Sequence, residues 1–427
     1  MGIRSEVSPL KQVIIHPPGV EHHYTLPENT YEWIQNSDGK LIHNPDYLLF
    51  DDLISPNLIT NEHNQLSEVL SAFTGIENTI HFMDLIKDIF HQKHNQMELL
   101  DECIALDEKV YGIKTKIDTK ILMDLDSNEL INLLISGRIH KENINTILKW
   151  PLPNLIFTRD VAAMIGNTLL ITWAKREARK RETLLMNFIS KHHPMFEHIK
   201  TFDFHTEHPE LSIEGGDIII FDTDTLFIGL SERNSLQSIN AILPLCYEEG
   251  FHRIVVVDLP KIRTVMHLDT IFSRISNKEV LVYPPLYVNK VMKGYPISIR
   301  YLECGQSIFE VESRNESLSD CLLYLGYKMK SIFCGGKEPT FQEREQWSDG
   351  ANAFALQPGK IISYSRNIET LGQLEQAGYR VVTYEEFLDH SKFWINSDEQ
   401  LVFSIDSAEL PRGRGGPRCL TLPLGRA

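Results

Sequence analysis

The chain has 427 residues, more than one hydrophobic core of about 250–300 residues accommodates, so we expect two domains or one core with a large insertion. Apolar residues make up 42% and charged residues 23% of the chain, as in ordinary globular proteins. The formal charge of −16 disfavours binding to nucleic acid or to an anionic membrane, because both need clustered lysine and arginine, and it favours a cationic small substrate.

The first residues lack the apolar core of a signal peptide, and the sequence contains no run of about 18 apolar residues. We therefore expect a cytoplasmic protein. Its six cysteines are dispersed without a Cys-x-x-Cys pair, which predicts neither a disulfide framework nor a zinc ribbon. Nucleotide-binding glycine patterns and metal-ligand spacings are missing from the sequence as well, so we expect no metal and no cofactor.

The chain begins with a predicted core strand over residues 11–16 that Pro17-Pro18-Gly19 ends. From about residue 75 to residue 149 glycine becomes rare and apolar residues recur at helical spacing. Asp126 and Glu129 form a capping-box pattern there, and Gly137 is a candidate helix C-cap. We predict an all-α helical domain over 75–149, inserted into a catalytic α/β domain that consists of residues 1–74 and 150–427.

One pattern recurs after residue 150: a polar residue, an apolar strand, a turn and a second apolar strand. It starts at Asp160, Asp217, Asp269 and Asn352. The turn residues, such as Gly166-Asn167, are those that hairpins require. Helices are predicted between the hairpins, over 177–191, 235–249, 318–326 and 370–378. Repeated units of this kind predict a pseudo-symmetric fold in which the polar strand starts converge on one site.

Several residues at these starts have the chemistry of a site that acts on a guanidinium group. Asp160 and Asp269 could clamp the planar fork of N–H donors, and the thiolate of Cys419 could attack its central carbon. His267 could deliver protons to the departing ammonia, with Glu214 as its orienting partner. Singly, each acid could cap a turn and Cys419 could be a buried thiol; together they indicate a reaction.

The motifs of this chain resemble those of the arginine deiminases, in order and over nearly its whole length. They are SPLKQVIIHPPG, LLFDDL, NLIFTRD, ARKRETLL, IEGGD, GLSER, MHLDTIFS, EREQWSDGAN and GRGGPRC. The resemblance implies the pentein fold, a pseudo-five-fold ββαβ propeller of class α/β, with a helical insertion after the first blade. It also implies a homo-oligomer, a dimer or a tetramer.

By the same resemblance, Cys419 is the nucleophile, His267 the general acid and base with Glu214 as partner, and Asp160 and Asp269 the guanidinium ligands. The residues that it assigns to binding the amino-acid end or shaping the pocket are Asn154, Phe157, Arg179, Arg233 and Arg414. The implied activity is that of a catabolic hydrolase that converts L-arginine to L-citrulline and ammonia through a thiouronium intermediate. Pro417-Arg418, where relatives often have smaller residues, is expected at the rim of the site.

Two other functions fit the same residues. One is a related guanidino-group enzyme: a hydrolase of agmatine or methylated arginine, or an amidinotransferase in which an amine replaces water. The three arginines favour a substrate with a carboxylate, which agmatine lacks. The other is a catalytically silent arginine-binding protein, which would have no need of the thiol.

Overall fold

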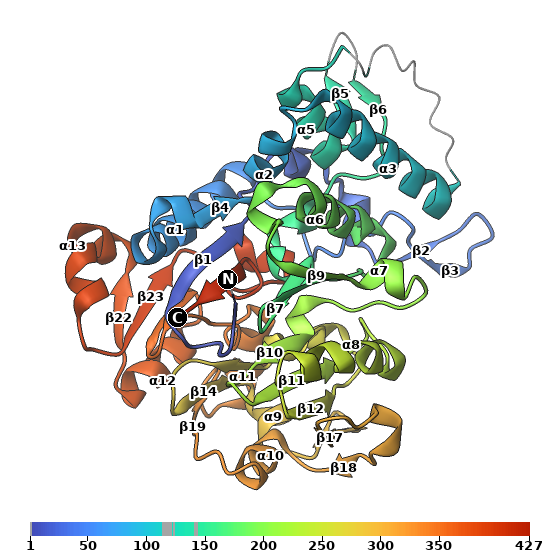
Figure 1. Ribbon diagram of the computed structural model, residues 1–427. Helices are drawn as coiled ribbons and strands as arrows, with labels where there is room; N and C mark the ends of the chain where they lie inside the picture. The colour runs from blue at the N-terminus through green and yellow to red at the C-terminus, as the bar shows by residue number, and fades with distance from the viewer. Residues whose placement is uncertain (1, 113–121, 123, 141–143) are drawn as a thin grey trace.

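The computed structural model describes residues 2–112, 122, 124–140 and 144–427 (Figure 1). In this part of the chain, five sheets share one plan: an antiparallel pair of strands, followed by a third strand that runs parallel to one of them. The three strands of each sheet are β24 (Leu422–Arg426), β1 (Leu10–Ile15) and β4 (Thr79–His81); β7 (Ala162–Ile165), β8 (Thr168–Ile171) and β9 (Lys200–Asp203); β10 (Ile218–Ile220), β11 (Thr225–Leu230) and β12 (Arg253–Asp258); β13 (Phe272–Arg274), β14 (Glu279–Val282) and β19 (Lys330–Phe333); and β20 (Phe354–Gln357), β21 (Lys360–Tyr364) and β23 (Leu401–Ile405).

The parallel strand of each sheet is reached through helical connections, as parallel pairing requires. The hairpins predicted after Asp160, Asp217, Asp269 and Asn352 are confirmed as β7–β8, β10–β11, β13–β14 and β20–β21. The connecting helices are α1 (Pro56–Thr74), α6 (Lys180–His192), α8 (Leu236–Glu248), α9 (Pro284–Tyr287) with α10 (Leu318–Tyr324), and α12 (Ile368–Ala377) with α13 (Tyr384–Asn396). Thus α6, α8, α10 and α12 confirm the four predicted helices, and the fold is mixed α/β.

The two ends of the chain lie in the same sheet. β24 pairs with β1 in antiparallel register, with Leu422 opposite Ile14 and Pro423 opposite Val13. The N-terminal and C-terminal ends are therefore neighbours (Figure 1). Because Cys419 lies three residues before the start of β24, this pairing holds the thiol at a fixed place relative to the first strand.

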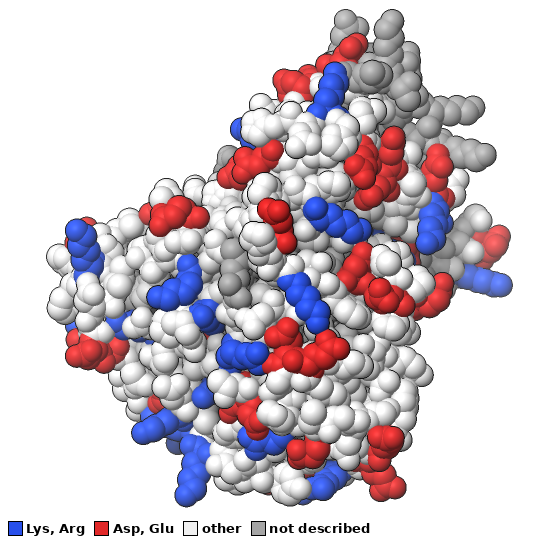
Figure 2. Space-filling model, in the orientation of Figure 1, with Lys and Arg blue, Asp and Glu red and all other residues white. Residues whose placement is uncertain are grey.

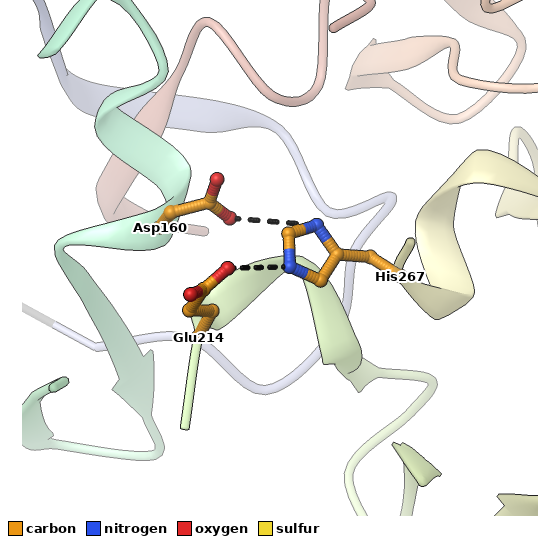
Figure 3. Close-up of side chains that lie close together, drawn as sticks. All are labelled: Asp160, Glu214 and His267. Atoms are coloured by element: carbon orange, nitrogen blue, oxygen red, sulfur yellow. Dashed lines mark hydrogen bonds and ion pairs between the residues drawn. The ribbon is translucent and has the colours of Figure 1, made fainter. Parts of the chain in front are cut away.

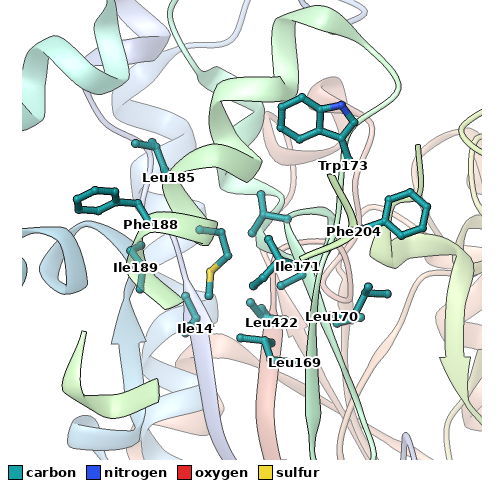
Figure 4. Close-up of a cluster of buried hydrophobic side chains, with 14 of the residues drawn as sticks. Ile14, Leu169, Leu170, Ile171, Trp173, Leu185, Phe188, Ile189, Phe204 and Leu422 are labelled. Atoms are coloured by element: carbon teal, nitrogen blue, oxygen red, sulfur yellow. The ribbon is translucent and has the colours of Figure 1, made fainter. Parts of the chain in front are cut away.

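The largest cluster of buried apolar side chains includes α6 and the strands beside it, part of which Figure 4 shows. Leu185, Phe188 and Ile189 on one face of α6 are buried with the strand residues Ile14 and Leu422. The strands of this region are buried on both faces, which explains why they read as continuous apolar runs rather than as alternating patterns. The prediction of these strands from continuous apolar runs therefore depends on the burial of both faces of each strand.

The stretch 75–149 is mixed rather than wholly helical, which corrects part of the prediction. It contains α2 (Phe82–Ile89), α3 (Lys93–Tyr111) and α5 (Ser127–Ser136), but also β4 and the hairpin of β5 (Arg138–His140) and β6 (Ile144–Thr146). β4 pairs with β1 and so belongs to the catalytic sheets, because the chain returns to the body before α2 begins. Residues 113–121, 123 and 141–143 of this stretch lie outside the described residues.

The capping box that opens α5 is confirmed. The Asp126 carboxylate accepts from the backbone N–H of Asn128 and Glu129, both at 2.8 Å, and the Glu129 side chain accepts from the Asp126 N–H at 2.9 Å. Gly137 ends the helix with φ +73°, the left-handed conformation that favours glycine.

The remaining elements are short strands, strands that extend the sheets, and two helices. They are β2 (Trp33–Gln35), β3 (Leu41–His43), β15 (Val291–Met292), β16 (Tyr295–Pro296), β17 (Ser298–Glu303), β18 (Arg314–Asn315), β22 (Arg380–Thr383), α7 (Phe204–Glu207) and α11 (Pro339–Trp347). Acidic and basic side chains are interspersed over the face that Figure 2 shows. Within the described residues, no helix combines the length and the apolar character that crossing a membrane requires.

Candidate active site

Polar side chains at the hairpin starts meet in one buried centre. Asp160 ends the 3-10 turn η5 (Thr158–Asp160), Glu214 precedes η8 (Gly215–Asp217), and His267 precedes η10 (Leu268–Thr270), which contains Asp269. η8 contacts both η5 and η10. Cys419 follows η12 (Leu410–Gly413) and precedes β24. All five residues are at most 5% exposed, so the structure brings the five predicted catalytic residues into the interior.

The imidazole of His267 lies between two carboxylates (Figure 3). Its Nε2 is 2.8 Å from Glu214 Oε2, and its Nδ1 is 3.8 Å from Asp160 Oδ1. Burial alone would lower the pKa of His267, but the charge of Asp160 and the hydrogen bond to Glu214 outweigh it and raise this pKa to about 10. Burial would raise the pKa of Glu214, but Arg233 and His267 together lower it. The pair is therefore an imidazolium and a carboxylate near neutral pH.

Two glycines explain the close approach of these turns. A Cβ on Gly216 would lie 2.5 Å from His267 Nδ1, and one on Gly215 would lie 2.1 Å from the Arg159 carbonyl oxygen. Neither distance is possible for a carbon atom, so only glycine allows η8 to reach both η5 and His267. The IEGGD motif is thus explained by packing against the imidazole.

Replacing Gly216 with alanine is expected to displace His267 and to lower turnover by about a hundredfold, the typical effect of a shift of roughly 1 Å in a reacting group. The matched control is Gly372→Ala in α12, where an added Cβ meets no atom within 4 Å. This control should gain about 0.5–1 kcal/mol of stability without loss of turnover. Steady-state kinetics and thermal unfolding of both variants test the pair; wild-type turnover by Gly216→Ala contradicts the packing explanation.

The Asp160 carboxylate holds an arginine of the protein itself. Arg179 Nη1 donates to Asp160 Oδ2 at 2.7 Å, while its Nε donates to Glu182 Oε2 at 2.9 Å and its Nη2 to the Asn154 carbonyl at 3.2 Å. Arg179 is buried, not on a solvated helix face. The guanidinium of Arg179 is thus bound to the Asp160 carboxylate, so this carboxylate is placed where it can pair with a guanidinium group.

Asp269 is also paired with an arginine, and this corrects the expected place of Arg418. Arg418 Nη1 donates to Asp269 Oδ2 at 2.8 Å, and Arg418 Nη2 donates to Glu6 Oε1 at 3.0 Å. Arg418 is 2% exposed, so it lies in the interior and not at the rim. The sequence could not reveal this, because Glu6 and Asp269 come from distant parts of the chain. The other oxygen of Asp269, Oδ1, is buried without a hydrogen-bond partner among the described residues.

The thiol of Cys419 is protonated in this ligand-free arrangement. Its Sγ lies 3.7 Å from Asp269 Oδ2 and 3.3 Å from the side-chain nitrogen of Asn352. Burial, followed by the negative charges of Asp269, Asp160 and Asp349, raises its pKa well above the ordinary value. Formation of the thiolate therefore needs a positive charge to be brought beside these carboxylates.

The residues predicted to hold the amino-acid end line the same cavity. The cavity volume is about 20 Å³, room for roughly one water molecule and much less than an amino acid occupies. Its lining also contains Leu49, Met266 and Thr270, which lie within the motifs LLFDDL and MHLDTIFS but received no role there, since apolar and hydroxyl side chains indicate no specific chemistry. The lining residues are Leu49, Asn154, Phe157, Asp160, Arg179, Arg233, Met266, His267, Thr270, Gly413, Arg414 and Cys419.

Arg233 and Arg414 keep unused hydrogen-bond donors at this cavity. Arg233 Nη1 and Arg414 Nε and Nη2 are buried and make no hydrogen bond to the described residues, although Arg233 Nη1 lies 3.6 Å from Glu214 Oε2 and Arg414 Nε lies 3.5 Å from Asp51 Oδ2. The Arg414 guanidinium stacks on Trp347, 3.8 Å from the ring centroid, and its Nη1 donates to the carbonyl of the same residue. Asn154 donates to the Leu48 carbonyl, which fixes the wall of the cavity. Phe157 packs against Gly413 and Gly415, where a Cβ would come within 2.9 and 2.3 Å of its ring.

Asp217, which the sequence also offered as a polar hairpin start, supports the site without entering it. Its Oδ2 accepts from the Ser231 hydroxyl at 2.5 Å and from Asn234 at 3.1 Å, and its Oδ1 accepts from the Leu268 N–H at 3.1 Å. It therefore ties β10 to the turn that follows His267.

One group of potential metal ligands occurs among the described residues, and it is the set of Asp160, Glu214 and His267. Its imidazole turns different ring nitrogens toward the two carboxylates. The geometry is that of hydrogen bonding and ion pairing.

A family model described as arginine deiminase matches residues 46–426 of the chain. The chain belongs to the arginine deiminase family. Curated relatives named arginine deiminase include one from Borrelia duttonii, 30% identical over 447 residues, with 100% of this chain and 98% of that protein covered. Another, from Mycoplasma capricolum, is 30% identical over 442 residues, with 100% and 97% covered.

A solved structure of similar fold is the product-bound N-terminal domain of ArgZ, an arginine dihydrolase of the cyanobacterial ornithine-ammonia cycle. It is 14% identical, with a TM-score of 0.50, and the alignment covers 97% of each chain. At this identity the likeness extends to the fold alone.

Proposed function

We propose that this protein is an arginine deiminase that hydrolyses L-arginine to L-citrulline and ammonia through a covalent thiouronium intermediate on Cys419. The observation that carries the proposal is a buried thiol beside an imidazolium–carboxylate pair and two aspartates, in a member of this family. Paired carboxylates complement the planar guanidinium, and the negative cavity wall favours a cation.

In the first half-reaction, the substrate guanidinium takes the place of Arg179 at Asp160 and offers donors to Asp269 Oδ1, which has no partner. Its positive charge offsets the carboxylates that disfavour the anion of Cys419, so the thiol loses its proton to solvent water. The thiolate attacks the guanidinium carbon. The His267 imidazolium then donates its proton to the leaving nitrogen, and ammonia departs from the tetrahedral intermediate.

In the second half-reaction, the neutral His267 accepts a proton from water, and the resulting hydroxide attacks the thiouronium carbon. Collapse of this second tetrahedral intermediate breaks the carbon–sulfur bond and releases the hydroxyl proton to solvent water, so that neutral citrulline leaves and Cys419 is again a thiolate. Glu214 holds the ring and stabilises its charged form through the 2.8 Å hydrogen bond.

Binding requires the cavity to open, since about 20 Å³ cannot hold the substrate. Arg179 has an alternative anion in Glu182 at 2.9 Å, whose pKa burial raises to about 7 despite Arg179. Release of Asp160 therefore leaves Arg179 paired and near the amino-acid end of the substrate, where it can meet the α-carboxylate.

The unused donors of Arg233 and Arg414 favour arginine over agmatine. Buried guanidinium N–H groups without a hydrogen bond are costly, and a carboxylate is the group that satisfies them best. Agmatine has no carboxylate and would leave them unsatisfied. A methylarginine hydrolase remains compatible with the carboxylate contacts but requires room for methyl groups at the guanidinium.

Replacing Arg414 with alanine is expected to raise the KM for L-arginine by about 10- to 100-fold, because one charged hydrogen-bond partner of the carboxylate is lost. Turnover of agmatine should change little. The control is Arg412→Ala, two residues away, whose exposed side chain pairs with Asp52 at 2.9 Å. Equal losses of arginine and agmatine turnover in Arg414→Ala would assign Arg414 to the loop structure instead.

The direct test is incubation of the purified, metal-free protein with L-arginine, agmatine and methylarginines, followed by measurement of citrulline and ammonia. Citrulline and ammonia in equal amounts from arginine support the proposal. Faster turnover of agmatine or methylarginine, or guanidino transfer to an added amine, assigns the related activities. Arginine binding by calorimetry with no turnover identifies a silent binder.

We further propose that the five sheets are the blades of one pseudo-five-fold pentein propeller, and that the part of 75–149 that follows β4 is an inserted domain. The shared strand plan and the meeting of the hairpin starts at one site support this arrangement. A cytoplasmic location and a dimer or tetramer are the expected setting. Sedimentation analysis of the purified protein tests the oligomeric state.

A further inference from the structure

Asn352 is the residue at the start of the β20–β21 hairpin and has no part in the reaction described above. It directly precedes the strand region of β20, as Asp160 precedes β7 and Cys419 precedes β24. Its side chain is fully buried. The sequence pattern set it beside the acidic hairpin starts but assigned it no chemistry, since an amide is neither an acid nor a nucleophile.

All four hydrogen-bonding positions of the Asn352 side chain are used. Its Oδ1 accepts from the backbone N–H of Arg418 at 3.0 Å and of Cys419 at 3.3 Å. Its Nδ2 donates to the Asp269 carbonyl at 3.0 Å and to Cys419 Sγ at 3.3 Å. An amide has two acceptor and two donor positions, so none is left over.

The orientation of this amide is fixed by its partners. A flipped side chain would turn its NH₂ group toward two backbone N–H donors and its oxygen toward the Asp269 carbonyl. Both contacts would be repulsive in a buried site. The arrangement therefore requires an N–H of Asn352 to point at the sulfur of the nucleophile.

Close packing holds the two segments together. A Cβ on Gly416 would lie 2.6 Å from Asn352 Oδ1 and 2.7 Å from its Cβ, so the glycine lets the loop of Cys419 rest directly on the Asn352 side chain. The contact joins residues 67 positions apart and depends on the fold as a whole.

We propose that Asn352 is a catalytic residue whose side-chain N–H donates a hydrogen bond to the Cys419 sulfur whenever that sulfur carries the negative charge. An N–H donor interacts more strongly with a thiolate than with a thiol and so favours the ionised form. It acts against burial and the three nearby carboxylates, which favour the thiol. The donor is neutral, so its effect does not depend on the protonation of His267.

This role, which rests on the proposed function, belongs to both half-reactions. Before attack, the hydrogen bond favours ionisation of Cys419. When the carbon–sulfur bond of the thiouronium breaks, the sulfur leaves with the electron pair of that bond, and the same N–H stabilises the departing thiolate.

The experiment measures alkylation of Cys419 by iodoacetamide as a function of pH without arginine, with mass spectrometry to separate it from the exposed Cys304. In Asn352→Ala, alkylation at neutral pH should be about 10- to 100-fold slower, the loss expected when a charged group loses one hydrogen bond. Alkylation and kcat/KM should both recover toward the wild-type values as the pH rises. A merely structural defect would not recover with pH.

Asn352→Asp is the second variant, because it preserves size and the acceptor for the two backbone N–H groups but places an acid where the donor was. Asn352→Asp should shift the pH profile of Cys419 alkylation to higher pH by at least as much as Asn352→Ala does. Asn95→Ala, which removes another buried amide, one that bonds to the Ile89 carbonyl in the helical region, is the control and should keep the wild-type profile. A wild-type alkylation profile in either folded Asn352 variant overturns the proposal. This readout uses no arginine, so its result stands apart from that of the substrate test.

Discussion

Cys419→Ser is expected to abolish citrulline formation, with a loss of about 10⁴-fold or more, as found when the nucleophile of a covalent mechanism is removed. A serine hydroxyl in the same place ionises far less readily than a thiol, and burial with three carboxylates would disfavour its anion further. Steady-state citrulline assays and single-turnover mass spectrometry measure the effect. The wild-type protein should gain the mass of the covalent intermediate during turnover, and the serine variant should not.

The control for this prediction is Cys304→Ser, which changes the exposed cysteine and should leave turnover unchanged. The variant Cys419→Ser should still bind arginine, because the aspartates and arginines remain. Retention of substantial turnover by Cys419→Ser would exclude the covalent mechanism, and binding by this variant shows that the site itself is intact.

His267→Gln is expected to lower kcat by about 10²–10⁴-fold, the usual contribution of a general acid and base. The imidazolium must donate its proton to ammonia, so wild-type kcat/KM should fall as the pH rises through the His267 pKa of about 10. In the pH profile of kcat, the corresponding fall should occur at lower pH, because the bound substrate guanidinium disfavours a second positive charge on His267 beside it. His267→Gln should lack both limbs.

The matched control is His252→Gln, whose exposed imidazole contacts Asp224 at 2.8 Å. It should preserve both the rate and the shape of the pH profile. A high-pH limb of unchanged position in His267→Gln would assign that limb to another group and contradict the role of His267 as acid.

The sequence predicted the local elements because each depends on neighbouring residues. Gly166 adopts φ +57° in the turn between β7 and β8, and Asp126 caps α5 through backbone groups two and three residues away. Such features need only a few residues in a row. For the same reason the strand β4 was missed: its three residues join the sheet through pairing with β1, more than sixty positions earlier, and not through any local pattern.

The sequence by itself determined which chemical groups the site has available: one thiol, one imidazole and the acids that follow from motif order. Only the tertiary structure decided which groups meet. It buries Arg418 against Asp269, turns Arg179 onto Asp160 and sets the amide of Asn352 on the sulfur of Cys419. The partners of the first and last of these contacts are 149 and 67 positions apart in the chain, so only the packing of whole sheets brings them together. Proton affinity follows the same rule, because burial and neighbouring charge, not residue type, make His267 basic and Cys419 protonated.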